Sequence, residues 1–190
     1  MPAHSKVVVD KFCELCDWLH QAWQTRKYLF DENPDFDNLK QPHYAHFFHR
    51  LSEILQEYWL LQLAKLHDPA VQGGQNGHIN LSIDYMIEYG QWDTITQSTL
   101  VDLKSKMMTL AKPIKDARNK ILSHNDLAVI LQSKELGGFD PGEDEAYFDC
   151  LHQFASIVKE AVDGGPFVYD NLVRNDIDIF MHCFNRGRIT

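Results

Sequence analysis

The 190-residue chain has a formal net charge of -9, with 44% hydrophobic and 24% charged residues. This composition is typical of a folded globular protein, and it excludes one that coats nucleic acid nonspecifically, which needs a basic surface to displace phosphate counterions. No apolar run approaches the roughly 20 residues of a membrane span, no export signal opens the chain, and four cysteines are too few for a disulfide scaffold, so we expect a cytoplasmic protein with no membrane contact.

Two long helices are predicted in the first third of the chain. Over residues 5–30, apolar side chains recur every three or four positions, which is the period of an amphipathic helix. The stretch DENPDFDNLKQP, residues 31–42, breaks this period and is predicted as a loop. The period returns over residues 47–66 and ends at HDPAVQGGQNG, where Pro69 and paired glycines stop the second helix.

The middle of the chain predicts a short helix followed by a long one. We expect NLSIDYMIEYG to form the short helix, with Asn80 or Ser82 as its N-cap and Gly90 at its end. From about Thr94, helical spacing continues for about thirty residues. Pro113 should kink this long helix, because proline removes a backbone donor and clashes with the preceding turn.

The last third of the chain completes a helical fold. After the break at GGFDPGEDE, Asp140 and Pro141 have the pattern of an N-cap and a first helical residue, and the helix should run to about Val162. The tail RNDIDIFMHCF predicts a further helix, or a strand because IDIF alternates. No strand pairs with hairpin turns are expected elsewhere. The predicted fold class is all-α, an antiparallel up-and-down helical bundle with a C-terminal extra helix. We expect a single domain over 1–190, with a core at about 6–162 and a C-terminal extension at 163–190.

Two clusters contain residue types that bind metals, but their spacing favours other roles. Cys13, Cys16 and His20 share one helix face, and His43, His46 and His49 recur in steps of three. Buried thiols on an apolar face explain the first cluster better, and a solvated helix start explains the second. We therefore predict no metal site and no cofactor.

A local basic stretch contrasts with the acidic chain. Six lysines and arginines lie between Lys104 and Lys120 against one acid, and the stretch ends in DARNKILSHND. Arg118 and His124 are six residues apart, roughly 120° around an ideal helix, so one helix cannot bring them together well. They are either the charged end of a surface helix or a site in which His124 turns back and a second subunit contributes.

The stretch RNKILSH, with Arg118, Asn119 and His124, resembles the Arg-to-His motif of the HEPN superfamily. The wider pattern of LLQLAKLHDPA, NLSI and KPIKDARNKILSHND is similar to the abortive-infection AbiU-like branch, over about residues 6–162. HEPN proteins are helical bundles, usually dimeric, and many are metal-independent ribonucleases that act as toxins in toxin-antitoxin, abortive-infection and CRISPR systems.

The resemblance implies a metal-independent endoribonuclease, a toxin or phage-defence effector whose 2'-OH attack gives a 2',3'-cyclic phosphate. His124 would transfer protons, Arg118 would hold the phosphate and Asn119 would orient the pair or bind ribose. It also implies an RNA substrate, a homodimer with a composite active site and a cognate antitoxin. Weaker candidates for substrate binding are Lys115, Lys120 and Asp68. The alternatives are a noncatalytic HEPN module that binds nucleotide, RNA or a protein partner, and a plain helical interaction protein.

Overall fold

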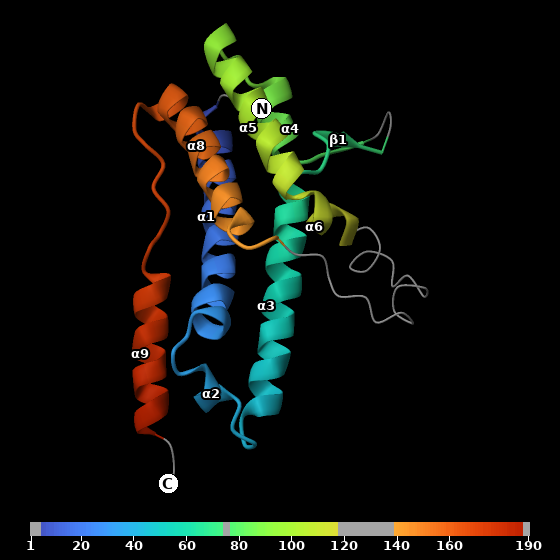
Figure 1. The fold of residues 1–190 in the computed structure, drawn as a ribbon. Helices are drawn as coiled ribbons and strands as arrows, with labels where there is room; N and C mark the ends of the chain where they lie inside the picture. The colour runs from blue at the N-terminus through green and yellow to red at the C-terminus, as the bar shows by residue number, and fades with distance from the viewer. Residues whose placement is uncertain (1–4, 74–76, 118–138, 188–190) are drawn as a thin grey trace. The chain divides into compact units, whose positions relative to one another are not determined.

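The computed structural model describes residues 5–73, 77–117 and 139–187, and these are mostly helical (Figure 1). The all-α fold class is confirmed. The helices are α1 (Lys6–Arg26), the π-helix η1 (Lys27–Asp31), α2 (Phe36–Leu39), α3 (Ala45–Leu66), α4 (Ile83–Tyr89), α5 (Thr94–Leu110), α6 (Lys112–Ala117), α8 (Glu143–Asp163) and α9 (Val173–Arg186). A short antiparallel pair joins β1 (Val71–Gln72) to β2 (His78–Ile79).

Local sequence signals explain most of the helix boundaries. The Ser82 hydroxyl accepts a hydrogen bond from the Tyr85 N–H and caps α4, so Ser82 rather than Asn80 is the N-cap. Asp93 caps α5 by accepting from the N–H groups of Ile95 and Thr96. Where a kink was predicted at Pro113, the structure has an interruption, since α5 ends at Leu110 and α6 begins at Lys112.

Three local predictions were wrong. The N-terminus of α8 is capped by Gly142 with a φ of 83°, so this helix begins later than Asp140 and Pro141 predicted. The predicted loop at 31–42 contains α2, whose four residues are too few to show a helical period. The β1–β2 pair was missed for the same reason, since two-residue strands carry no alternation.

The described chain groups into two compact units. Of the described residues, 5–16, 60–73, 77–117 and 139–168 belong to unit 1, and 17–59 and 169–187 belong to unit 2. Helices α1 and α3 contribute residues to both units. The single domain over 1–190 stays a prediction.

The core of unit 1 is built on an antiparallel contact between α1 and α8. The rings of Phe12 and Phe154 lie 5.7 Å apart, and both side chains are fully buried. Beside them, the Cys13 thiol donates a weak hydrogen bond to the Ala155 carbonyl at 3.9 Å. Helix α5 packs against α8, where Leu100 and Met107 are fully buried. This apolar contact fixes the register of the two helices.

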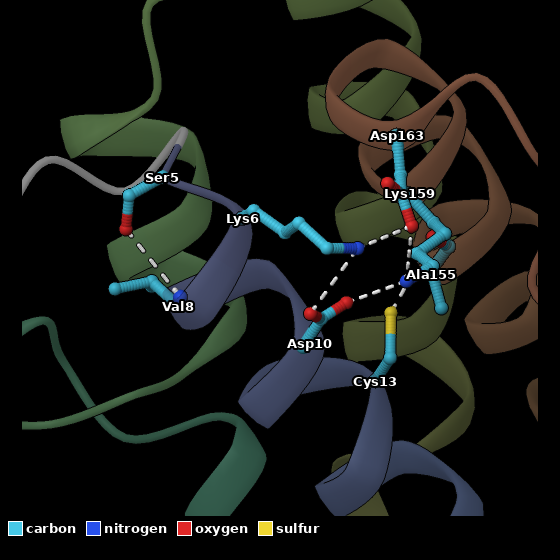
Figure 2. A network of polar contacts seen from close by, with 8 residues as sticks. All are labelled: Ser5, Lys6, Val8, Asp10, Cys13, Ala155, Lys159 and Asp163. Atoms are coloured by element: carbon cyan, nitrogen blue, oxygen red, sulfur yellow. Dashed lines mark hydrogen bonds and ion pairs between the residues drawn. The ribbon is translucent and has the colours of Figure 1, made fainter.

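Four charged side chains close the same contact at the N-terminal end of α1 (Figure 2). Lys159 of α8 donates hydrogen bonds to Asp10 and, at 2.9 Å, forms an ion pair with Asp163. Lys6 donates to Asp163 at 2.6 Å and lies 3.5 Å from Asp10. Hydrogen bonds from Lys159 hold the pKa of the Asp10 carboxyl below its ordinary value, and those from Lys6 and then Lys159 do the same for Asp163.

Unit 2 has its own apolar core, to which the C-terminal helix contributes. Ile177 and Met181, one turn apart on α9, are buried against side chains from the first half of the chain. Those side chains are Leu29, Phe30, Leu39 and Phe48. The tail is therefore a helix rather than a strand, because its buried positions are four residues apart.

We predict that Lys159→Met lowers the free energy of unfolding at neutral pH more than at acid pH. The pKa values of Asp10 and Asp163 are lower in the folded protein than in the unfolded chain. The two carboxylates therefore stabilise the fold above the unfolded value near 3.8, and this contribution is lost as the pH falls through the lower folded values. Urea denaturation at pH 7 and pH 3 measures the difference.

The exposed Lys65 on α3 supplies the control, because Lys65→Met removes a lysine of the same helical environment outside this network. We expect Lys65→Met to change the unfolding free energy little at either pH. An effect of Lys159→Met that is equal at pH 7 and pH 3 would contradict the ionic role.

Candidate functional site

Helix α6 leads directly to the segment that carries the predicted catalytic residues. Its Ile114 side chain is fully buried, as is Ala111 just before it, so the helix is anchored in unit 1. Arg118, Asn119, Lys120 and His124 lie outside the described residues, and their roles stay predictions. The structure places the backbone of Lys115 in α6 and describes no more of that residue.

Asp68, the other weak candidate, lies in the turn after α3. Its backbone N–H donates to the Lys65 carbonyl at 3.1 Å, which continues the helix for one turn. The side chain is half-buried, in the same unit as α6. Asp68 therefore has a defined backbone position in unit 1, while its part in any reaction stays a prediction.

A buried histidine beside Asp68 was missed by the sequence analysis. His67 Nε2 and the Tyr147 hydroxyl oxygen share a hydrogen bond of 2.9 Å, whose direction depends on the histidine tautomer. The exposed fractions of His67 and Tyr147 are 5% and zero. Burial raises the pKa of Tyr147 well above its ordinary value, so its hydroxyl stays protonated at neutral pH. The signal was present in LLQLAKLHDPA, but no spacing rule links a histidine to a tyrosine 80 positions later.

Tyr147 also contacts the first described residue that follows residues 118–138 in the sequence. The ring of Phe139 lies 5.5 Å from that of Tyr147, near the N-terminus of α8. Ile114 and Phe139 thus hold the described chain on either side of residues 118–138 to one compact unit. The His67–Tyr147 pair connects the end of α3 to the start of α8 within that unit.

The basic stretch is partly neutralised by ion pairing. Lys104 Nζ lies 2.7 Å from an Asp84 carboxylate oxygen, with exposed side-chain fractions of 29% and 20%, so this lysine links α5 to α4. Lys106 and Lys112 are exposed. Of the described lysines in the stretch, these two are therefore better placed than Lys104 to meet an anion in solvent.

The first cluster of possible metal ligands is a packing feature. Burial raises the pKa of Cys13 to about 11, so the residue is a neutral thiol at physiological pH. His20 is buried, and its ring stacks on Tyr169 with centroids 3.8 Å apart. Within the described parts of the chain, no group of three or more His, Cys, Asp or Glu side chains could hold a metal ion.

Comparison with known families agrees with the fold. The family model HEPN_AbiU2, described as AbiU2, matches residues 8–182, from α1 to most of α9. The chain therefore belongs to the AbiU2 family of HEPN-type abortive-infection domains. Neither a curated protein nor a solved structure matches it significantly.

A further finding concerns the apolar character of the helices. None of the described helices combines enough length with enough hydropathy to cross a bilayer.

We predict that Tyr147→Phe lowers the free energy of unfolding by about 1 to 3 kcal/mol, the usual cost of depriving a buried polar group of a hydrogen-bond partner. His67 Nε2 loses the Tyr147 hydroxyl inside a site that water does not reach. Urea denaturation of the purified variant measures the loss.

Tyr58→Phe is the matched control, because the Tyr58 hydroxyl accepts a 2.6 Å hydrogen bond from the exposed Trp18 indole. Water can replace that partner, so a change within about 0.5 kcal/mol is expected. Equal losses of unfolding free energy in the two variants would show that the buried hydrogen bond stabilises the protein no more than the exposed one.

Proposed function

We propose that this protein is a metal-independent endoribonuclease in which Arg118, Asn119 and His124 act on RNA. The observation that carries the proposal is the family match over residues 8–182, which includes the whole of RNKILSH. In the sequence, that stretch directly follows α6, whose Ile114 side chain is fully buried, and this supports the proposal. Membership of an abortive-infection family favours a role as a toxin or phage-defence effector.

The proposed chemistry uses the ribose of the substrate as the nucleophile. A histidine with an ordinary pKa near 6.5 can remove the proton of the 2'-OH, and the oxygen then attacks the adjacent phosphorus. The bond from phosphorus to the 5'-oxygen breaks, and that oxygen takes up a proton. The products are a 2',3'-cyclic phosphate and a 5'-hydroxyl. His124 is the proton-transfer group, since imidazole exchanges protons at neutral pH.

Arg118 and Asn119 complete the proposed site. A guanidinium presents several fixed donors and stays charged, so Arg118 suits the phosphate oxygens as their charge grows in the transition state. Asn119 orients the pair or binds ribose. Lys115, Lys120 and Asp68 are weaker contributors to substrate binding. The exposed Lys106 and Lys112 offer additional contacts to the RNA backbone.

We predict that the purified protein cleaves RNA in the presence of EDTA and that either His124→Ala or Arg118→Ala reduces the rate by about 100-fold or more. Cleavage of a fluorophore-labelled RNA pool on denaturing gels measures the rate. His46→Ala and Arg50→Ala, which remove an exposed histidine and an exposed arginine of α3, are the matched controls. They should retain the wild-type rate.

The same assay separates the proposed function from its alternatives. A substrate with a 2'-deoxyribose at the cleaved position should resist cleavage, because it lacks the attacking oxygen. RNA binding without cleavage by the wild-type protein would indicate a noncatalytic HEPN module. Absence of both binding and cleavage would indicate an interaction protein. Cleavage that persists in both site variants would place the chemistry elsewhere.

The proposal includes a homodimer whose two motifs share one cleft, since Arg118 and His124 cannot converge well on a single helix. We predict a solution mass of twice the 22.1 kDa chain by light scattering. On dilution, the cleavage rate per chain should fall in parallel with the dimer fraction. A monomer with undiminished activity would contradict a composite site. A cognate antitoxin that covers this cleft remains part of the proposal.

A further inference from the structure

A small cleft lies where α2 meets α3 in unit 2. Its volume is about 260 Å³, somewhat below the size of pockets that bind drug-sized molecules. Helix α2 and α3 form two walls, because the lining positions on each recur at helical spacing, and η1 adds one ring. The lining residues are Phe30, Phe36, Leu39, Lys40, Ala45, Phe48, His49 and Ser52.

The interior of the cleft is apolar. Phe30, Leu39 and Phe48 belong to the buried core of unit 2, with exposed fractions of 5%, 1% and 6%. The half-buried ring of Phe36 meets Phe30 edge to face, with centroids 6.2 Å apart. A guest that enters the cleft therefore contacts side chains whose positions the core already fixes, so little ordering cost is added on binding.

The rim of the cleft carries groups that favour an anion. Lys40 Nζ lies 4.1 Å from the centre of the Phe36 ring and 3.1 Å from an Asp37 carboxylate oxygen. Because the Asp37 side chain is 93% exposed, this ion pair is weak and an incoming carboxylate can compete with it. The exposed His49 and the half-buried Ser52 add further hydrogen-bonding groups. The described residues that line this cleft include no carboxylate.

The geometry points to a binding site for a small carboxylate with an apolar tail, of the medium-chain acyl type. We propose that the tail occupies the space beside Phe30, Leu39 and Phe48 and that the carboxylate lies at Lys40. A larger cleft of about 440 Å³ lies between the 28–35 stretch and α9. It does not favour an anion in the same way, because both basic and acidic side chains line it. These are Arg174, His182 and Arg186, and Glu32, Asp35 and Asp178.

Isothermal titration with butanoate, hexanoate and octanoate tests the apolar part of the proposal. Each methylene group that enters the cleft should tighten binding about fourfold, until the cleft is filled. Octanamide has nearly the same tail without the charge and should bind more weakly than octanoate. Equal affinities for octanoate and octanamide, or no dependence on chain length, would overturn the proposal.

Substitutions at the rim test the charged part. Lys40→Met should weaken octanoate binding by about threefold, the scale of one exposed ion pair. Asp37→Asn should strengthen it by about twofold, because the ammonium loses its competing partner. Lys65→Met, on α3 but outside the cleft, should leave the affinity unchanged. Unchanged affinity in both Lys40→Met and Asp37→Asn would exclude a carboxylate at this rim.

Ser52→Phe tests the location by filling the cleft, and it should abolish octanoate binding while circular dichroism shows the same helix content. Full binding by this folded variant would overturn the proposed position. If Ser52→Phe does not fold, Asp37→Asn still tests whether the carboxylate binds at Lys40. The Asp37 side chain is solvent-exposed, so this substitution leaves the core unchanged. The outcome is independent of RNA cleavage, since no variant in this series changes Arg118, Asn119 or His124.

Discussion

The antiparallel contact between α1 and α8 is the constraint on which unit 1 depends. Buried rings fix its middle, and the ion pairs of Lys6 and Lys159 fix one end. Helix α5 packs on the same α8. Helix α6 continues from α5 and brings the chain to residue 117. The last described residue before the proposed catalytic stretch therefore lies in a unit built on the contact between α1 and α8.

Helical period accounts for what could be predicted about the fold. The long amphipathic helices and the break at Pro113 have strong local causes, and the sequence showed each of them. The start of α8 could not be predicted as well, because Asp140 and Gly142 are both acceptable caps and only the left-handed backbone at Gly142 decides between them. Helix α2 spans little more than one helical turn, so polar residues around Leu39 outweighed the buried leucine in the sequence signal.

For the candidate site too, only part could be predicted from the sequence. Candidate reactive groups within one short stretch, such as RNKILSH, can be proposed from residue types, and the family match covers that stretch. Contacts between residues that are far apart in the sequence cannot be predicted in this way. His67 meets Tyr147 because the C-terminal end of α3 and helix α8 lie in one unit, and Lys40 lines an apolar cleft that residues of α2 and α3 form together. Sequence thus identified candidate reactive groups, while burial identified the groups that hold their surroundings in place.

Helix α9 has a consequence for how far the chain can be shortened. Ile177 and Met181 complete the core of unit 2, and Asn185 accepts a hydrogen bond from the Asn38 side-chain amide and donates one to Asp35. A chain cut at residue 162 would leave the apolar faces of Phe30 and Phe48 open to water. Such a fragment would retain every residue of RNKILSH and yet expose an apolar surface that favours aggregation. Although α9 lies beyond the motif, a fragment in which the core of unit 2 stays covered has to include it.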